Sequence, residues 1–114
     1  MNTVTLEVRS LADTLTDVAA AMETLTPSAP RISFETLELL WKVLTVKRWQ
    51  LIETLTGAGP MTIREAARRV QRDVKAVHGD VHALLNAGLL DKTEDGKIVF
   101  PYDAIHVDFM VKAA

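Results

Sequence analysis

The stretch TIREAARRVQRDVKAVHGDVHALLNAGLL, residues 62–90, predicts two helices that follow each other closely along the chain. Its first four residues have the form of a capping box. In such a box the Thr62 hydroxyl accepts a hydrogen bond from the Glu65 amide, and the Glu65 carboxylate reaches back to the Thr62 amide. A turn at 71–73 then separates this short helix from a longer one, which we expect at residues 72–87.

The longer helix has two distinct sides when its residues are placed 100° apart. One side is apolar and is predicted to face the core: Val70, Val74, Val77, Val81, Leu84 and Leu85. The opposite side carries two cations, an amide and three very small residues: Arg72, Lys75, Ala76, Gly79, Ala83 and Asn86. The major groove of DNA admits one helix and favours such groups, because phosphates attract Lys and Arg and base edges accept Arg or Asn contacts. We interpret this side as a DNA-contacting face; the alternative is an ordinary solvated face with a tolerated glycine.

His78 and His82 lie four residues apart and share one flank of the longer helix. Asp80 projects about 200° away from His78, so the three residues do not form one ligand set. We interpret the two histidines as groups at the rim of the groove that contact phosphate, with plain surface histidines as the alternative. A zinc site without cysteine usually needs three or four ligands, so no metal or other cofactor is predicted. A metal or ligand sensor that adds His106 to the pair is the weakest hypothesis.

The acidic residues of this region are expected to be structural, because anions on a DNA-binding face weaken phosphate binding. Asp73 can cap the longer helix. Asp80 can pair with a cation of the preceding helix: Arg64, Arg68 or Arg69. Four further cations are candidate contacts to DNA, three to phosphate and one on the hairpin described below: Arg69, Lys47, Arg48 and Lys97.

Hydrophobic periodicity predicts the elements on either side of this stretch. The chain is expected to begin with a strand at 4–8 that exposes one face, a helix at 11–25 capped by Ser10, and a two-proline linker at 26–30. An extended piece at 32–34 and a helix at 37–44 follow, and then a helix that Thr45 caps and that GAGP at 57–60 ends. After the two helices above, we expect a tight hairpin turn with Asp95 and Gly96 at its tip and a terminal strand at 105–111. Residues 35–101 in this order describe a winged helix-turn-helix. The expected fold is α+β, mainly α, with residues 1–30 as a strand-helix extension used for dimerisation and 31–114 as the DNA-binding domain.

Charge is distributed unevenly along the 114 residues, although the net charge is only −2. Residues 1–40 hold 2 basic and 6 acidic residues, residues 41–90 hold 8 and 4, and residues 91–114 hold 3 and 5. The basic middle coincides with the proposed DNA-binding helices. The acidic start supports an alternative function, in which this region docks a basic protein partner.

Composition and motifs exclude several other classes of protein. There is no cysteine, and no apolar run approaches the ~20 residues that span a bilayer, so we expect a cytoplasmic protein with no membrane contact. No nucleophile, base and orienting residue occur together, and GAGP is not followed by a lysine-containing phosphate loop. We therefore do not expect an enzyme.

The segment GPMTIREAARRVQRDVKAVHGDVHALLNAGLL also resembles the winged helix-turn-helix of MarR-like regulators, and more narrowly a haloarchaeal-type DNA-binding protein family. The resemblance extends loosely over residues 31–108. It implies a dimeric prokaryotic transcription regulator, with repression as the expected mode. Some such proteins are encoded beside a toxin gene and are taken as antitoxins, so a cognate toxin is an alternative partner. Gly79 stands where relatives often carry a bulky or basic residue, which weakens any base contact assigned there.

Overall fold

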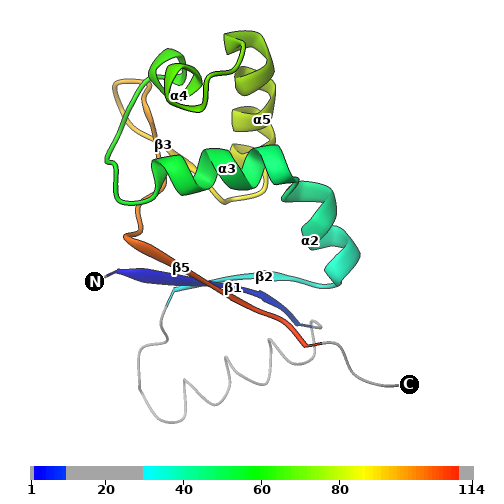
Figure 1. Cartoon of the computed structure of the whole chain (residues 1–114). Coiled ribbons are helices and arrows are strands. Elements are labelled where there is room, and N and C mark those ends of the chain that lie inside the picture. Colours follow the sequence, from blue (N-terminus) through cyan, green and yellow to red (C-terminus); the bar gives the residue numbers. More distant parts are fainter. Residues whose placement is uncertain (1, 10–29, 111–114) are drawn as a thin grey trace.

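The computed structural model describes residues 2–9 and 30–110 as an α+β chain (Figure 1). Its elements are β1 (Thr3–Val8), β2 (Arg31–Phe34), α2 (Leu37–Val43), α3 (Val46–Leu55), α4 (Ile63–Val70), α5 (Val74–Asn86), β3 (Asp91–Lys92), β4 (Ile98–Val99) and β5 (Ala104–Asp108). The helix expected at 11–25, with its Ser10 cap, lies outside the described residues. No helix among the described residues is long and apolar enough to cross a membrane.

β1 is the middle strand of a three-stranded sheet and pairs in parallel with both β2 and β5. Leu6 lies opposite Ile32 on one side and Val107 on the other. Parallel strands of one sheet require long connections, and the connection from β2 to β5, which lie on opposite sides of β1, contains all the described helices and the hairpin. The sequence predicted these extended segments but not their pairing. Both partners of β1 lie after residue 30, where the sequence predicts a domain boundary.

The expectation that β1 exposes one face is wrong, because Glu7 is buried as well as Val4 and Leu6. The Glu7 carboxylate accepts a hydrogen bond from the Ser33 hydroxyl at 3.0 Å. It also lies 3.6 Å from a guanidinium nitrogen of Arg31. These partners explain the burial, since a carboxylate leaves water only when charges and hydrogen bonds replace its hydration.

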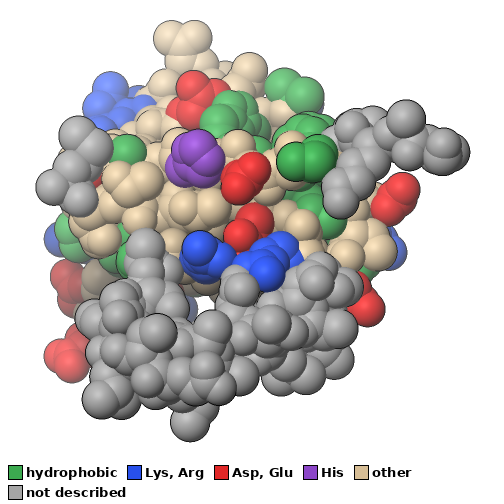
Figure 2. Space-filling view, turned by 90° about the horizontal axis from the view of Figure 1, so that it is seen from below, with side chains coloured by type: hydrophobic (Ala, Val, Ile, Leu, Met, Phe, Trp, Pro, Cys, Tyr) green, Lys and Arg blue, Asp and Glu red, His purple; other side chains and the backbone are tan. Residues whose placement is uncertain are grey.

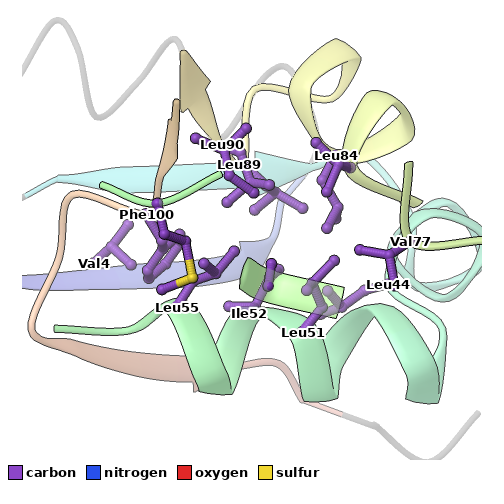
Figure 3. Close-up of a cluster of buried hydrophobic side chains, with 14 of the residues drawn as sticks. Val4, Leu44, Leu51, Ile52, Leu55, Val77, Leu84, Leu89, Leu90 and Phe100 are labelled. Atoms are coloured by element: carbon purple, nitrogen blue, oxygen red, sulfur yellow. The ribbon is translucent and has the colours of Figure 1, made fainter. Parts of the chain in front are cut away.

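Helices α2 and α3 lie on one side of the sheet, and α4, α5 and the β3–β4 hairpin lie farther from it (Figure 1). Figure 3 shows side chains from the sheet, the helices and the hairpin converging on one core. Its fully buried members include Val4, Leu6, Leu51, Ile52, Leu55, Val77, Leu84 and Phe100. The predicted core side of α5 is confirmed at Val77, Val81 and Leu84, whereas Val74 is 42% exposed because it opens the helix beyond this core.

Side-chain caps begin all four described helices. The Thr45 hydroxyl accepts from the Arg48 amide, the Thr62 hydroxyl from the Glu65 amide, and the Asp73 carboxylate from the Lys75 amide, as expected. The reciprocal half of the capping box is wrong, since the described hydrogen bonds of the Glu65 carboxylate come from Arg68 and Arg69. Gln71 ends α4 in the left-handed region with φ of 55°. This turn moves the start of the next helix from the expected residue 72 to Val74.

The β3–β4 hairpin turns at the predicted residues but with a different geometry. The Gly96 amide donates to the Thr93 carbonyl at 3.0 Å, and the Thr93 amide donates to the Lys97 carbonyl at 2.8 Å. Gly96 has φ of +84°, whereas Asp95 does not have positive φ. The expected two-residue turn is therefore wrong: the pattern is that of a longer turn closed by a left-handed glycine. Ile98 of this hairpin also bridges to Met61, which ties the hairpin to the loop before α4.

Candidate nucleic-acid interface

The exposed face of α5 carries six neighbouring residues with accessible side chains or backbone: Lys75, Ala76, His78, Gly79, His82 and Asn86. A Cβ atom built on Gly79 would meet no other atom within 4 Å. The packing of this chain therefore does not explain the glycine, which weakens a helix by about 1 kcal/mol relative to alanine. The face therefore presents one cation, one amide and two imidazoles, and the residues between them, Ala76 and Gly79, are very small.

Asp80 lies on a flank of α5 and joins this helix to two arginines from other parts of the chain. Its Oδ1 atom accepts a hydrogen bond from Arg48 Nε at 3.0 Å, and its Oδ2 atom accepts one from Arg72 Nη2 at 2.7 Å. Arg48 also donates to the Val43 carbonyl at 3.0 Å, so it spans from the end of α2 to α5. The expected pairing of Asp80 with a cation of α4 is wrong, because Arg68 and Arg69 of α4 pair with Glu65 of the same helix.

The two arginines are largely covered, with side-chain exposures of 23% for Arg48 and 18% for Arg72. Arg72 Nη1 is buried without a hydrogen-bond partner among the described residues. The expected place of Arg72 on the exposed side of the helix is wrong, since Arg72 precedes α5 in the turn after Gln71. Both arginines hold α5 in position, and their charge is shared with Asp80.

The pKa of Asp80 shows which effect dominates in this cluster. Burial raises the pKa, but hydrogen bonds from Arg72 and then Arg48, with the attraction of their charges, outweigh it and leave the pKa below its ordinary value. Asp80 is therefore a carboxylate at neutral pH, and it leaves the cluster with a net charge of +1.

Glu65 forms a second charged cluster, on α4. It pairs with Arg68, and it accepts a hydrogen bond from Arg69 Nε at 3.0 Å. Hydrogen bonds from Arg68 and then Arg69 lower the pKa of Glu65 to about 2. The same contact raises the pKa of Arg68. Arg69, expected to bind phosphate, is thus exposed but shares its charge with Glu65.

Other cations remain available on the surface. Lys47, Lys75 and Arg64 are exposed and form no ion pair with another described residue. Lys47 lies in the first turn of α3, and Arg64 in the first turn of α4, where helix N-termini favour anions. The sequence offered Arg64 as one of three possible partners of Asp80, and its position near a helix start is the signal that could have identified it as a surface cation. Lys97 Nζ lies 3.6 Å from Asp95 Oδ2, so this carboxylate partly neutralises the positive charge at the hairpin.

His78 and His82 lie in contact on the surface of α5. Their Nε2 atoms are 3.1 Å apart and their ring centroids 4.2 Å apart. His106 is on β5 instead, and the described residues contain no group of three side chains able to hold a metal ion. The structure therefore does not bring together the three histidines of the sensor hypothesis.

A model of the HVO_A0114 family matches residues 43–107, which is more than half of the chain. The chain belongs to the HVO_A0114 family. No curated protein matches it at a significant level. The HVO_A0114 region runs from the end of α2 into β5 and contains α3, α4, α5 and the hairpin. All the candidate interface residues lie within it, whereas β1 and β2 lie outside.

Proposed function

We propose that this chain is a sequence-specific DNA-binding transcription regulator, a repressor, that places the exposed face of α5 in the major groove. The fold would then act as a winged helix-turn-helix, with α4 and α5 as the helix pair and the β3–β4 hairpin as the wing. The observation that carries the proposal is the composition of the α5 face. Lys75 and Asn86 flank Ala76 and Gly79, and a Cβ added at Gly79 would meet no described residue outside α5 within 4 Å.

The roles of individual residues follow from their exposure and pairing. Lys75 and Asn86 contact base edges, because both are exposed on α5 and the side chain of neither is engaged by another described residue. Lys47 and Arg64 bind phosphate with support from the amides of their helix starts. His82 and Arg69 lie at the rim, and Lys97 lies on the wing.

Arg72 and Arg48 act through Asp80 rather than by direct contact with bases. Their guanidinium groups donate hydrogen bonds to Asp80 of α5, and these bonds fix the orientation of the helix relative to the rest of the protein. A direct base contact by Arg72 would break its 2.7 Å hydrogen bond with Asp80 and leave that carboxylate with only one partner.

The first experiment is selection from a randomised duplex library at near-physiological salt, with the Lys75→Ala, Asn86→Ala double variant in parallel. Lys42→Ala serves as the matched control, since Lys42 is an exposed lysine on α2. We expect the wild type and the control to enrich the same motif, and the double variant to enrich none. Affinity for the selected site falls steeply with salt, and loss of a single phosphate-binding cation such as Lys47 reduces that slope by about one.

Failure of the wild type to enrich any sequence would overturn the proposal. A protein-docking function, with a toxin or another basic protein as the partner, would then be the better explanation. Enrichment by wild type and double variant alike would keep DNA binding but remove α5 as the reading helix.

A further inference from the structure

An apolar groove of about 410 Å3 lies where α2, α3 and β5 meet. Both tryptophans of the chain, Trp41 and Trp49, line it, together with Val46 and Val107. Trp41 is 54% exposed and Val46 is 74% exposed, although both are large apolar residues. In Figure 2 hydrophobic side chains gather on the right-hand side of the molecule, the side on which α2 lies in Figure 1.

The apolar surface continues from the groove along the end of β5. Phe109 packs edge to face against Trp41, with ring centroids 6.1 Å apart, and is itself 41% exposed. Val107, which lines the groove, is 39% exposed. Applied to whole-residue areas, the exposed fractions of Trp41, Val46, Val107 and Phe109 amount to apolar surface on the order of 400 Å2, the size of the largest patch on a typical monomeric protein.

β5 is also an edge strand, because among the described strands it pairs only with β1. Every second residue of an edge strand directs its N–H and C=O groups away from its one neighbour. The open edge and the apolar groove therefore adjoin, and a partner that adds a strand to β5 would cover both.

We propose that the partner is a second copy of this chain, which adds its own β5 in antiparallel orientation across a two-fold axis at Val107. This register places Val107 opposite its copy, Ile105 opposite Phe109, and His106 opposite Asp108. Apolar residues then meet on the face that carries the groove, and an imidazole meets a carboxylate on the other face, twice by symmetry. The result is a continuous six-stranded sheet with the two tryptophan grooves side by side at its centre.

The size of the patch suits this arrangement. Burying on the order of 400 Å2 of apolar surface on each copy gives about 800 Å2 in total, and the pairing of the two β5 strands buries backbone in addition, which is the size of a weak interface. The pair is therefore expected to dissociate on dilution. This inference goes beyond the proposed function and does not depend on it, since self-association is measured without DNA.

The test is sedimentation equilibrium of the full chain over a range of concentrations, with wild type, His106→Asp, and the double variant His106→Asp, Asp108→Lys. Both side chains are exposed in the single chain, and circular dichroism verifies that each variant keeps the fold. We expect the wild type to approach twice the 12.6 kDa chain mass. In His106→Asp, the new carboxylate faces Asp108 of the other copy at both symmetry-related positions. The repulsion is expected to raise the dimer dissociation constant about tenfold. The double variant restores opposite charges and returns the constant to near the wild-type value.

Tryptophan emission supplies a second readout, because Trp41 becomes exposed when the copies separate. We expect emission to shift to longer wavelength on dilution, at the same concentrations at which the mass falls. A chain that stays monomeric up to about 1 mM would overturn the proposal. A dimer that ignores the single substitution, or that the double substitution does not restore, would overturn it as well by placing the interface elsewhere.

Discussion

Asp80 is the charged residue that links α5 to two arginines outside the helix, in addition to the core contacts of its buried side. Its two carboxylate oxygens bind Arg48 from α3 and Arg72 from the turn before α5, and Arg48 continues to the carbonyl of Val43. A carboxylate that is 16% exposed and shared between two guanidinium groups has a defined position, unlike a surface ion pair. The orientation of the proposed DNA-reading face therefore depends on one side chain that does not itself face DNA.

Asp80→Asn is expected to destabilise the chain by about 2 kcal/mol, because two largely covered guanidinium groups lose their common anion. The effect depends on pH. The pKa of Asp80 is lowered in the folded state, so its stabilisation is complete above its unfolded pKa of about 3.9 and is lost as the pH falls through the lower folded value. Chemical denaturation of wild type and variant from pH 7 to pH 3 measures this. Glu53→Gln, at an exposed position on α3, is the control and should change stability by less than about 0.5 kcal/mol. A wild type to Asp80→Asn difference that stays constant down to pH 3 would show that the charge of Asp80 is not its source.

Substitutions at Gly79 are expected to affect the stability of the fold and the binding of DNA in different ways. Gly79→Ala is expected to raise stability by roughly 1 kcal/mol, since the new Cβ meets nothing within 4 Å and alanine is the better helix former. Gly79→Leu adds bulk to the same open position and is expected to weaken binding to the selected DNA at least about tenfold, through loss of close approach to the groove. Thermal unfolding and fluorescence anisotropy provide the two readouts. Unchanged DNA affinity in Gly79→Leu would mean that the glycine does not face the bases.

Among single residues, the sequence was informative where the cause was local and failed where it was not. The Thr45, Thr62 and Asp73 caps follow from contacts within three residues, and all three are present. The role of Arg72 could not be predicted, because a left-handed Gln71 shifts the helix start and Asp80, eight residues away, draws the guanidinium inward.

At the scale of elements, the β3–β4 hairpin depends on the conformation of one glycine. Gly96 has φ of +84° and donates its amide to the Thr93 carbonyl, while the Thr93 hydroxyl binds the Asp95 carboxylate. That hydroxyl is the main cause of a lowered Asp95 pKa, which burial opposes and Lys97 supports. The turn is thus built from the backbone of Gly96 and one short side-chain network.

Gly96→Ala is expected to destabilise the hairpin by about 1 kcal/mol, because an L-residue at this φ is strained even though space for a Cβ is available. The comparison is Lys92→Ala, at an exposed position on β3 of the same hairpin. Hydrogen exchange at the Thr93 amide, which donates to the Lys97 carbonyl across the turn, reports whether the hairpin opens. Slower exchange in Gly96→Ala than in wild type would contradict the proposed strain.

The helices and hairpin could be placed from the sequence, since periodicity, caps and glycine all act within one element. The tight turn was misassigned because an Asp-Gly pair is compatible with turns of different length, and only the φ of Asp95 separates them. The two strand segments at the ends were predicted as extended, but alternation indicates that a strand exists and not which strand it pairs with.

For the molecule as a whole, the central place of β1 changes how the chain divides. The sequence favoured a separate extension at 1–30, because a linker-like stretch with two prolines at 26–30 follows the expected strand and helix. The structure instead places Val4 and Leu6 in the core with α3 and the hairpin, with no exposed surface on either side chain. Parallel pairing of the first strand with the last brings together residues about 100 positions apart, as in the 101-residue separation of Asn2 and Asp103. Such contacts leave no local signal in the sequence.

Leu6→Ala is expected to lower the stability of the entire chain, not only that of its first segment. Removing a fully buried leucine side chain from the middle strand costs about 3 kcal/mol, which lowers Tm by roughly 15 °C in a domain of this size. Because Leu6 shares one core with the helices, far-UV circular dichroism and tryptophan fluorescence should report a single coincident transition in wild type and variant. Leu39→Ala, at a position that is 43% exposed, provides the control and should cost less than about 1 kcal/mol. If Leu6→Ala left the transition followed by tryptophan unchanged while an earlier transition appeared in circular dichroism, residues 1–30 would form a separate unit after all, and the boundary drawn from the prolines would be the correct one.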